Sequence, residues 1–190
     1  DTPAKIERWQ HTGRVELVSY PEQHQQQRHY WNAFRHFAIN ERCEWVAIAD
    51  VDEFWFCKSG ETLASYLQRD TAHDALFVHW TNFGSGGHER QPDSVRTSLV
   101  QHDPNLGPLP KCIFRTFLPQ KEDDIEVHFI RNASLRRASV ADRTLQLNHY
   151  VAQSRDFWFK VKMTRGDVYY SEVDLNGLAA RFQQVNDAST

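Results

Sequence analysis

The stretch that most constrains the fold is Trp45 to Phe56, with the sequence WVAIADVDEFWF. Its first five residues are apolar, which is typical of a strand buried inside an α/β sheet. Three carboxylates follow almost at once, on Asp50, Asp52 and Glu53. Carboxylates at the end of a buried strand repel one another and lose hydration, so they need a compensating charge. A divalent cation such as Mg²⁺ or Mn²⁺ supplies that charge, because hard oxygen ligands suit these ions.

A solvated surface turn is the competing interpretation of the same residues, because Asp-x-Asp spacing recurs by chance in a chain of this size. The placement favours a functional site. In open α/β sheets, ligands bind beyond the carboxyl ends of the strands, and these carboxylates follow such a strand end. We therefore expect Asp50 and Asp52 to belong to a metal site.

The composition narrows the class of protein. A length of 190 residues suits one domain, 1–190, with a sizeable core. The net charge of −3 comes without a basic tract, which argues against a nucleic-acid partner. Three widely spaced Cys indicate neither a disulfide framework nor a zinc site, and they favour a reducing compartment. No apolar run approaches the ~20 residues of a membrane span, so we expect a cytoplasmic protein, free or peripheral to a membrane.

Helical and strand patterns alternate along the chain, which is typical of an α/β domain with a parallel sheet. The patterns predict helices over residues 5–12, 23–40, 59–68, 154–165 and 174–184, and strands over 14–20, 45–49, 75–83, 111–117, 125–130 and 145–151. Ser154 is expected to cap the fourth of these helices. A Gly-rich loop, residues 84–88, follows the third strand and is expected to be flexible.

His149 stands at the end of a predicted strand, where it can complete a metal site begun by Asp52, since imidazole binds Mn²⁺. A hydrogen-bonded structural histidine is the alternative. The shared-metal hypothesis has a geometric limit. It fails if the two side chains lie more than about twice a metal–ligand bond of ~2.2 Å apart.

Lys160 and Arg165, on the helix that follows, are candidate cations for a phosphate. Lys160 also lies one turn after Asp156, so an ordinary ion pair along the helix is an equal alternative.

The segment from Trp80 to His88 places two aromatic residues, Trp80 and Phe83, beside the Gly-rich loop that carries His88. This pattern suits stacking on a sugar face and movement over it. A plain surface connection with a core tryptophan is the alternative.

Five blocks then occur in order along the chain. They are Asp50-Val51-Asp52-Glu53-Phe54, Trp80 to His88, Lys111 at a strand start, Asn148-His149-Tyr150, and Ser154 to Gly166. From about residue 15 to 187 this series resembles the glycosyltransferase family 2-like and family 92 group of GT-A proteins. The resemblance implies a GT-A-like α/β fold, with a mixed sheet flanked by helices. It also implies that the first N-terminal β-α unit is lacking, because only one predicted strand precedes residues 23–40.

The resemblance implies a hexosyltransferase-like enzyme that uses a nucleotide-diphospho-sugar donor and Mn²⁺ or Mg²⁺. Asp52 would bind the metal directly, and Asp50 would lie near the metal or the donor's ribose. His149 would complete the coordination, while Lys160 and Arg165 would face the diphosphate.

The acceptor of such an enzyme is a glycan or another hydroxyl compound. An inverting reaction, which we expect, needs a base for the hydroxyl proton. The candidate bases are His88, Glu89, Asp93 and Glu53, and the candidate acceptor contacts are Trp80, Phe83 and His88. The Gly-rich loop is favoured because it is expected to lie over the acceptor.

Two other functions compete with this one. A catalytically inactive sugar- or nucleotide-binding module would share the aromatic surplus and the missing unit. A phosphatase or phosphotransferase of the haloacid-dehalogenase type also places Asp-x-Asp after a buried strand. That family has Thr or Val two residues after the second Asp, where this chain has Phe54.

Overall fold

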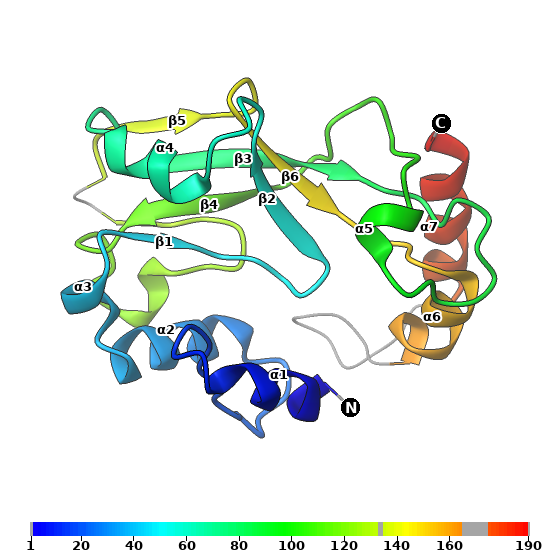
Figure 1. The fold of residues 1–190 in the computed structure, drawn as a ribbon, viewed down its shortest axis with the longest axis horizontal. Coiled ribbons are helices and arrows are strands. Elements are labelled where there is room, and N and C mark those ends of the chain that lie inside the picture. The colour runs from blue at the N-terminus through cyan, green and yellow to red at the C-terminus, as the bar shows by residue number, and fades with distance from the viewer. Residues whose placement is uncertain (1, 133–134, 165–174, 190) are drawn as a thin grey trace.

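The computed structural model describes residues 2–132, 135–164 and 175–189, and it is built around one mixed sheet with helices on its faces and at one end (Figure 1). The strands are β1 (Trp45–Ala47), β2 (Glu53–Cys57), β3 (Ala75–Asn82), β4 (Pro110–Arg115), β5 (Ala138–Val140) and β6 (Leu145–His149). The helices are α1 (Thr2–Gln10), α2 (Gln26–His36), α3 (Ile39–Arg42), α4 (Leu63–Arg69), α5 (Val95–Ser98), α6 (Arg155–Lys160) and α7 (Leu175–Ala188).

The strand order is β1-β4-β3-β6-β2. β5 pairs with the first residues of β3, and β6 pairs with the last residues of the same strand. Among the described strands, the parallel pairs are β3 with β5 and β3 with β6, and the other pairs are antiparallel. The mixed sheet flanked by helices confirms the expected GT-A-like α/β class. The all-parallel arrangement suggested by the alternation of elements is wrong, because β4 runs antiparallel to both β1 and β3.

Successive strands β1 and β2 lie at opposite ends of the strand order, although only residues 48–52 join them. This crossing loop therefore passes over the ends of the inner strands. The indole Nε1 of Trp55 donates to the carbonyl of Ile48 at 3.3 Å, and the backbone N of Glu53 donates to the carbonyl of Asp50 at 3.0 Å. The acidic residues are thus held above the sheet instead of on a free surface turn.

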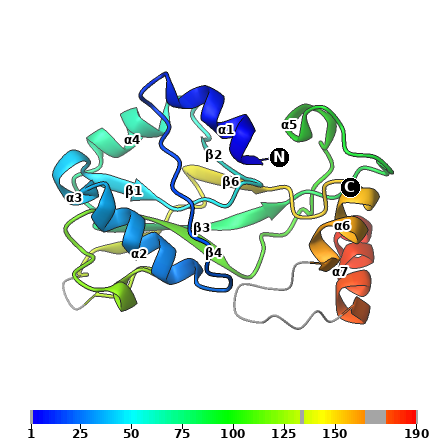
Figure 2. The same cartoon turned by 90° about the horizontal axis from the view of Figure 1, so that it is seen from below.

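The core lies on both faces of the sheet, because alternate residues of a strand point to opposite sides. On β3, Ala75 packs in a cluster with Phe34 of α2. Its neighbour Leu76 packs in a second cluster with Leu67 of α4. Helices α2 and α4 consequently cover opposite faces (Figure 2). At one end of the sheet, Trp158 of α6 packs against Phe182 of α7, with ring centroids 5.5 Å apart.

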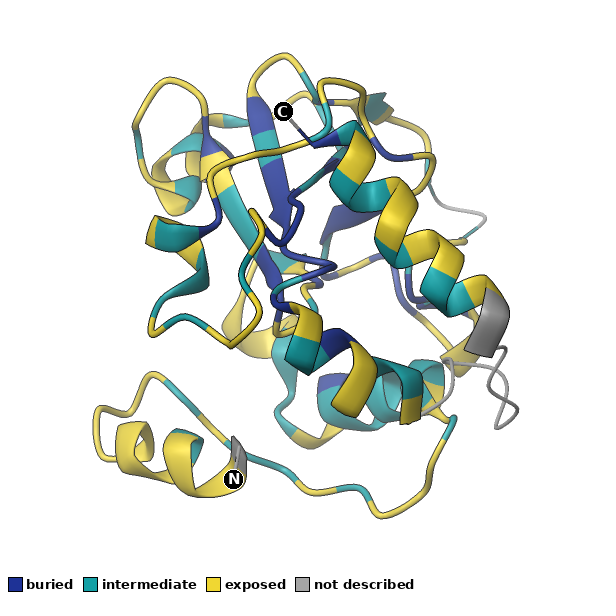
Figure 3. Cartoon of the chain, turned by 90° about the vertical axis from the view of Figure 1, so that its right-hand side faces the viewer, coloured by how far each residue is buried: buried dark blue, intermediate teal, exposed yellow. Residues whose placement is uncertain are grey.

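Several predicted elements differ from the structure. Residues 14–20, all of which are described, form no strand but an extended segment after α1, in which half-buried and exposed residues alternate (Figure 3). Residues 125–130 make only an isolated bridge between Ile125 and Ile130. In both cases apolar alternation is present, but the segment finds no strand edge to pair with. The predicted helix over 23–40 divides at Ala38, whose φ is 46°.

Other boundaries agree with the sequence. The hydroxyl of Ser154 accepts from the backbone N of Phe157 at 3.1 Å, which confirms the predicted cap of α6. None of the described helices is both long enough and apolar enough to cross a membrane. Arg165, Gly166 and Asp174 lie outside the described residues.

Asp74 anchors the start of β3 and gives a test of the fold. Its buried carboxylate accepts from Arg137 Nη2 at 2.6 Å and from the backbone N of Arg137 at 3.2 Å. The hydrogen bond from the Arg137 guanidinium is the main reason that the pKa of Asp74 lies below its usual range. A carboxyl whose folded-state pKa is lowered stabilises the protein above its unfolded pKa of ~3.9, and that contribution disappears as the pH falls through the folded-state pKa.

We therefore expect Asp74→Asn to lower the melting temperature by about 3 °C at pH 7. The difference in melting temperature between the variant and the parent protein should shrink as the pH falls below ~4. Thermal melts at pH 7 and pH 3.5 measure both values. An equal gap at the two pH values would show that the carboxylate charge at residue 74 does not contribute to stability.

Candidate functional site

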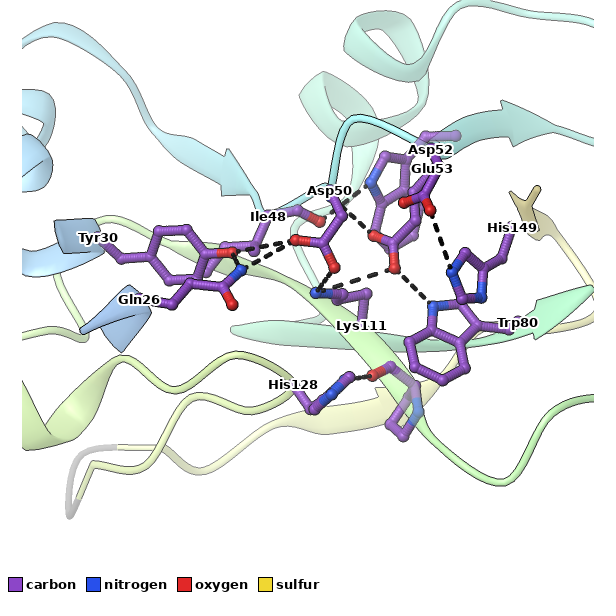
Figure 4. Close-up of polar contacts among 12 residues, drawn as sticks. Gln26, Tyr30, Ile48, Asp50, Asp52, Glu53, Trp80, Lys111, His128 and His149 are labelled. Carbon is purple, nitrogen blue, oxygen red and sulfur yellow. Dashed lines mark hydrogen bonds and ion pairs between the residues drawn. The ribbon is translucent and has the colours of Figure 1, made fainter. Parts of the chain in front are cut away.

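The crossing loop faces polar side chains that come from four strands (Figure 4). Glu53 begins β2, Trp80 lies on β3, Lys111 on β4 and His149 at the end of β6. In the sheet register, His149 is paired with Glu53 on one side and with Asn82 on the other. Residues far apart in the sequence thus meet at one end of the sheet, beside Asp50 and Asp52.

Asp50 is held by a buried lysine. Lys111 Nζ lies 2.9 Å from Asp50 Oδ2, and its side chain is 0% exposed. The carboxylate also accepts from Gln26 Nε2 at 3.0 Å and from the Tyr30 hydroxyl at 3.4 Å. Burial alone would raise the pKa of Asp50, but the neighbouring ammonium of Lys111 outweighs it, and the net shift is downward. Asp50 is therefore ionised and already compensated by a cation of the chain itself.

Glu53 connects the crossing loop to β3. Its carboxylate accepts from Trp80 Nε1 at 2.8 Å and from the backbone N of Asp50 at 2.9 Å, and Lys111 Nζ lies 3.8 Å away. Burial raises the pKa of Glu53 to about 7, against the opposing effect of Lys111. The buried carboxylate of Glu53 thus fixes the indole and the loop, and its role as a base stays a prediction.

Asp52 and His149 form the second part of the site. Their Oδ2 and Nε2 atoms are 3.9 Å apart, which lies within the limit set for a shared metal. His149 Nδ1 lies 3.0 Å from Asn82 Oδ1, so the neutral ring carries its hydrogen on Nδ1 and presents the Nε2 lone pair to Asp52. Burial lowers the pKa of His149 to about 3, despite the opposing charge of Asp52. The imidazole is thus neutral, which is the state in which it can bind a metal.

Lys162, just beyond α6, contacts Asp52. Its Nζ lies 3.1 Å from Asp52 Oδ2, and its side chain is 14% exposed. The ammonium also lies over the ring of Trp158, 5.7 Å from the centroid. A cation of the chain therefore lies beside the carboxylate of Asp52.

The residues present can hold a divalent ion through two ligands, Asp52 and His149. Among the described residues, no group of three or more His, Cys, Asp or Glu is arranged around a metal position. Two protein ligands suit Mg²⁺ or Mn²⁺, since such ions complete their coordination with water and substrate phosphates. Asn82 orients the imidazole in the way that outer-shell groups do at metal sites. The carboxylate of Asp50 is turned to Lys111, so its role as a ligand stays a prediction.

Of the two predicted phosphate cations, Lys160 pairs with a residue of its own helix, and Arg165 lies outside the described residues. Lys160 makes the helical ion pair with Asp156 at 2.9 Å, and its side chain is 71% exposed. Arg165 is not among the described residues. The diphosphate role of both stays a prediction. Lys162, which sequence reasoning missed, is the lysine that reaches Asp52.

The Gly-rich loop is tied to α7. The backbone N and hydroxyl of Ser85 both donate to Asn186 Oδ1 at 2.7 Å. Glu89 lies 3.7 Å from Arg155 and is 72% exposed. Asp93 is exposed as well, and the backbone carbonyl of His88 accepts from the backbone N of Arg155 at 3.0 Å. In the described parts of the chain, no ion pair or hydrogen bond connects these three candidate bases to Asp52 or His149, and their role stays a prediction.

The two predicted acceptor aromatics have different surroundings. Trp80 lies beside His149, with ring centroids 4.5 Å apart. Phe83 is buried against Tyr150, with centroids 4.7 Å apart, in a cluster with Leu99. Trp80 is therefore the aromatic residue that borders the site.

Two cavities flank the site. An apolar one of about 260 Å³ has Tyr30, Phe34 and Ile48 in its lining, and it adjoins Asp50 through Tyr30. A second one of about 540 Å³ has Trp80 and Asn82 in its lining, and it adjoins His149 through both. Figure 4 shows Tyr30 and His149 on opposite sides of Asp50.

The mixed sheet with its flanking helices and the acidic loop at one end of the inner strands define a GT-A-like glycosyltransferase. Comparison with protein families agrees with this class. The family model of Glycosyltransferase family 92 matches residues 4–185, so the chain belongs to that family. It is therefore a glycosyltransferase. No curated protein matches the sequence.

Proposed function

We propose that this glycosyltransferase moves a sugar from a nucleotide-diphospho-sugar donor to a hydroxyl acceptor, with Mn²⁺ or Mg²⁺ held by Asp52 and His149. The observation that carries the proposal is the 3.9 Å approach of Asp52 Oδ2 to His149 Nε2. Both atoms are electron-pair donors in the neutral-imidazole state, and a carboxylate with an imidazole is a ligand pair that suits Mn²⁺. When bound, the metal supplies Lewis-acid stabilisation for the departing diphosphate.

Lys162 would bind the diphosphate beside the metal. Its ammonium lies within 3.1 Å of Asp52 Oδ2, so a modest side-chain rotation would carry it from the carboxylate to a phosphate oxygen. A fixed cation is worth most where negative charge develops, and here that is the oxygen that leaves the anomeric carbon. Lys162 would therefore stabilise the nucleoside diphosphate as it departs.

The two cavities allow us to propose which end of the donor lies on each side of the metal pair. Tyr30 and Gln26 contact Asp50 on one side of the metal pair, beside the apolar cavity of about 260 Å³. An apolar cavity with a polar edge suits a flat base and its ribose. We therefore place the nucleoside toward α2 and the transferred sugar toward Trp80.

The transfer itself is a single displacement in the inverting reaction that we propose. The acceptor oxygen bonds to the anomeric carbon, the bond from that carbon to the phosphate oxygen breaks, and the hydroxyl proton passes to a base. His88, Glu89 and Asp93 are the proposed bases, with Glu89 and Asp93 open to solvent.

Donor turnover tests the proposed function. The protein is incubated with UDP-, GDP- and CDP-sugars and Mn²⁺, and release of the free nucleotide is measured with and without EDTA. We expect one nucleoside-diphospho-sugar to be consumed, and EDTA to abolish its consumption. Consumption that is unaffected by EDTA would contradict the metal role. Saturable donor binding without any turnover would favour a catalytically inactive binding module instead.

A further inference from the structure

The 540 Å³ cavity beside His149 has two walls from distant parts of the chain. One wall is the loop 103–109, which contributes Leu106 and Leu109. The other is α7, which contributes Ala180 and Arg181. The end of β3 lies between them, with Trp80 and Asn82 in the lining. The cavity therefore begins at the residues that orient His149 and opens between a loop and a helix.

The loop wall is fixed to β3. The backbone N of Gly107 donates to the carbonyl of Trp80 at 2.7 Å, and the backbone N of Asp103 donates to the carbonyl of Asn82 at 2.9 Å. A Cβ on residue 107 would lie 2.9 Å from Asn82 Nδ2 and 3.1 Å from Trp80 Cβ, so only glycine allows this approach. The loop wall of the cavity is thus held in place by β3.

The position of Trp80 is fixed as well. Glu53 accepts from its Nε1 at 2.8 Å, and its ring lies against that of His149 with centroids 4.5 Å apart. The same indole therefore borders both the proposed metal pair and the cavity. A ligand in the cavity would lie next to the sugar that the donor presents.

The lining combines apolar and polar groups without a net charge. Among the described residues that line it, Arg181 and Asp103 are the only charged ones, and their charges are opposite. The carboxylate of Asp103 accepts from the backbone N of Asn105 at 2.8 Å through one oxygen. Asn82 and Gln184 add amide groups, while Leu106, Leu109 and Val185 add apolar surface. This mixture suits a ligand with hydroxyls around an apolar ring face.

We propose that this cavity is the acceptor site, and that it binds the acceptor as a neutral hexopyranoside. The hydroxyls would bind Asn82, Gln184 and Arg181, and the C–H face of the ring would lie on the apolar lining. A volume of about 540 Å³ falls in the range of small-molecule sites. The assignment as acceptor site rests on the proposed function, but sugar binding in the cavity can be measured without turnover.

The test fills the cavity from α7. Ala180 is exposed and lines the cavity, so Ala180→Trp places a large side chain in it. Gln183→Trp is the matched control, because Gln183 is exposed on the same helix, binds Asp187 Oδ1 at 2.6 Å and is not among the lining residues. Both variants are first compared with the parent protein by thermal melting.

Binding is measured by saturation-transfer NMR with methyl hexopyranosides of gluco, galacto and manno configuration, and with glucuronate and octyl glucoside. We expect at least one methyl hexopyranoside to bind the parent protein and Gln183→Trp alike, and to bind Ala180→Trp about tenfold more weakly, a loss of about 1.4 kcal/mol. UDP binding in the presence of Mn²⁺ should be the same in all three proteins.

Three results would overturn the proposal. They are no binding of any methyl hexopyranoside to the parent protein, equal binding by both tryptophan variants, and signals confined to glucuronate or to the octyl chain of octyl glucoside. Failure of the proposed function would give a different result. The parent protein would turn over no donor, but it would still bind the sugar, and Ala180→Trp would still weaken that binding.

Discussion

Replacing Lys111 with methionine is expected to destabilise the protein by about 3–5 kcal/mol, because it removes the fully buried ammonium that compensates the carboxylates of Asp50 and Glu53. Methionine can fill the space of the lysine stem, so the cost arises from the charge and not from a cavity. Asp50 would lose the ammonium at 2.9 Å, and Glu53 the same ammonium at 3.8 Å. With a total stability of about 5–15 kcal/mol for a typical domain, much of the margin would disappear. Urea unfolding followed by tryptophan fluorescence measures the change.

The control is Lys160→Met, which removes an exposed lysine paired with Asp156 along α6. Exposed pairs of this kind contribute about 0.5 kcal/mol or less. The double variant Lys111→Met/Asp50→Asn should recover part of the loss, because it also removes the carboxylate charge that Lys111 contacts at 2.9 Å. Equal stability of Lys111→Met and Lys160→Met would refute the structural role given to Lys111.

The second large effect concerns activity. Asp52→Asn keeps the shape of the side chain but removes the negative charge that faces His149 at 3.9 Å and Lys162 at 3.1 Å. Loss of even an outer-shell group costs about 10–100-fold in metal affinity or activity, so loss of a direct ligand should cost about 100-fold or more in donor turnover. Nucleotide release at saturating Mn²⁺ measures it.

Asp123→Asn is the matched control for this experiment. Asp123 is an exposed carboxylate in the turn Glu122–Asp124, so the substitution changes the net charge equally without touching the site. It should turn over the donor like the parent protein. If Asp52→Asn retained more than about a tenth of the parent rate, the ligand role of Asp52 would be untenable.

The local parts of the fold follow from sequence. A continuous apolar run locates β3, because its residues pack in core clusters on both faces of the sheet. Leu145 and Leu147, which alternate with polar residues, locate β6. The serine cap locates the start of α6. Alternation alone gives a false strand at residues 14–20, because pairing depends on a strand edge that the sequence does not specify. The acidic stretch identifies the site, since three carboxylates after an apolar run need compensation wherever they lie.

The source of that compensation depends on long-range topology. The crossing of residues 48–52 from one end of the sheet to the other brings Asp50 over Lys111, 61 positions away in sequence. A lysine at the start of an apolar strand was the available signal, because a fully buried lysine needs a carboxylate partner. Lys162 gave no such signal. It contacts Asp52 because α6 ends at Lys160, five residues before the predicted helix end.

The central claim is that Asp52, His149 and Lys162 bind a nucleoside diphosphate through a divalent ion. Isothermal titration calorimetry of the protein with UDP, GDP and CDP, each with Mn²⁺ and with EDTA, tests it most directly. The account predicts saturable binding of one of the three that requires Mn²⁺ and is lost in His149→Ala. The absence of binding heat for all three nucleotides with Mn²⁺, or equal heats with Mn²⁺ and with EDTA, would contradict it.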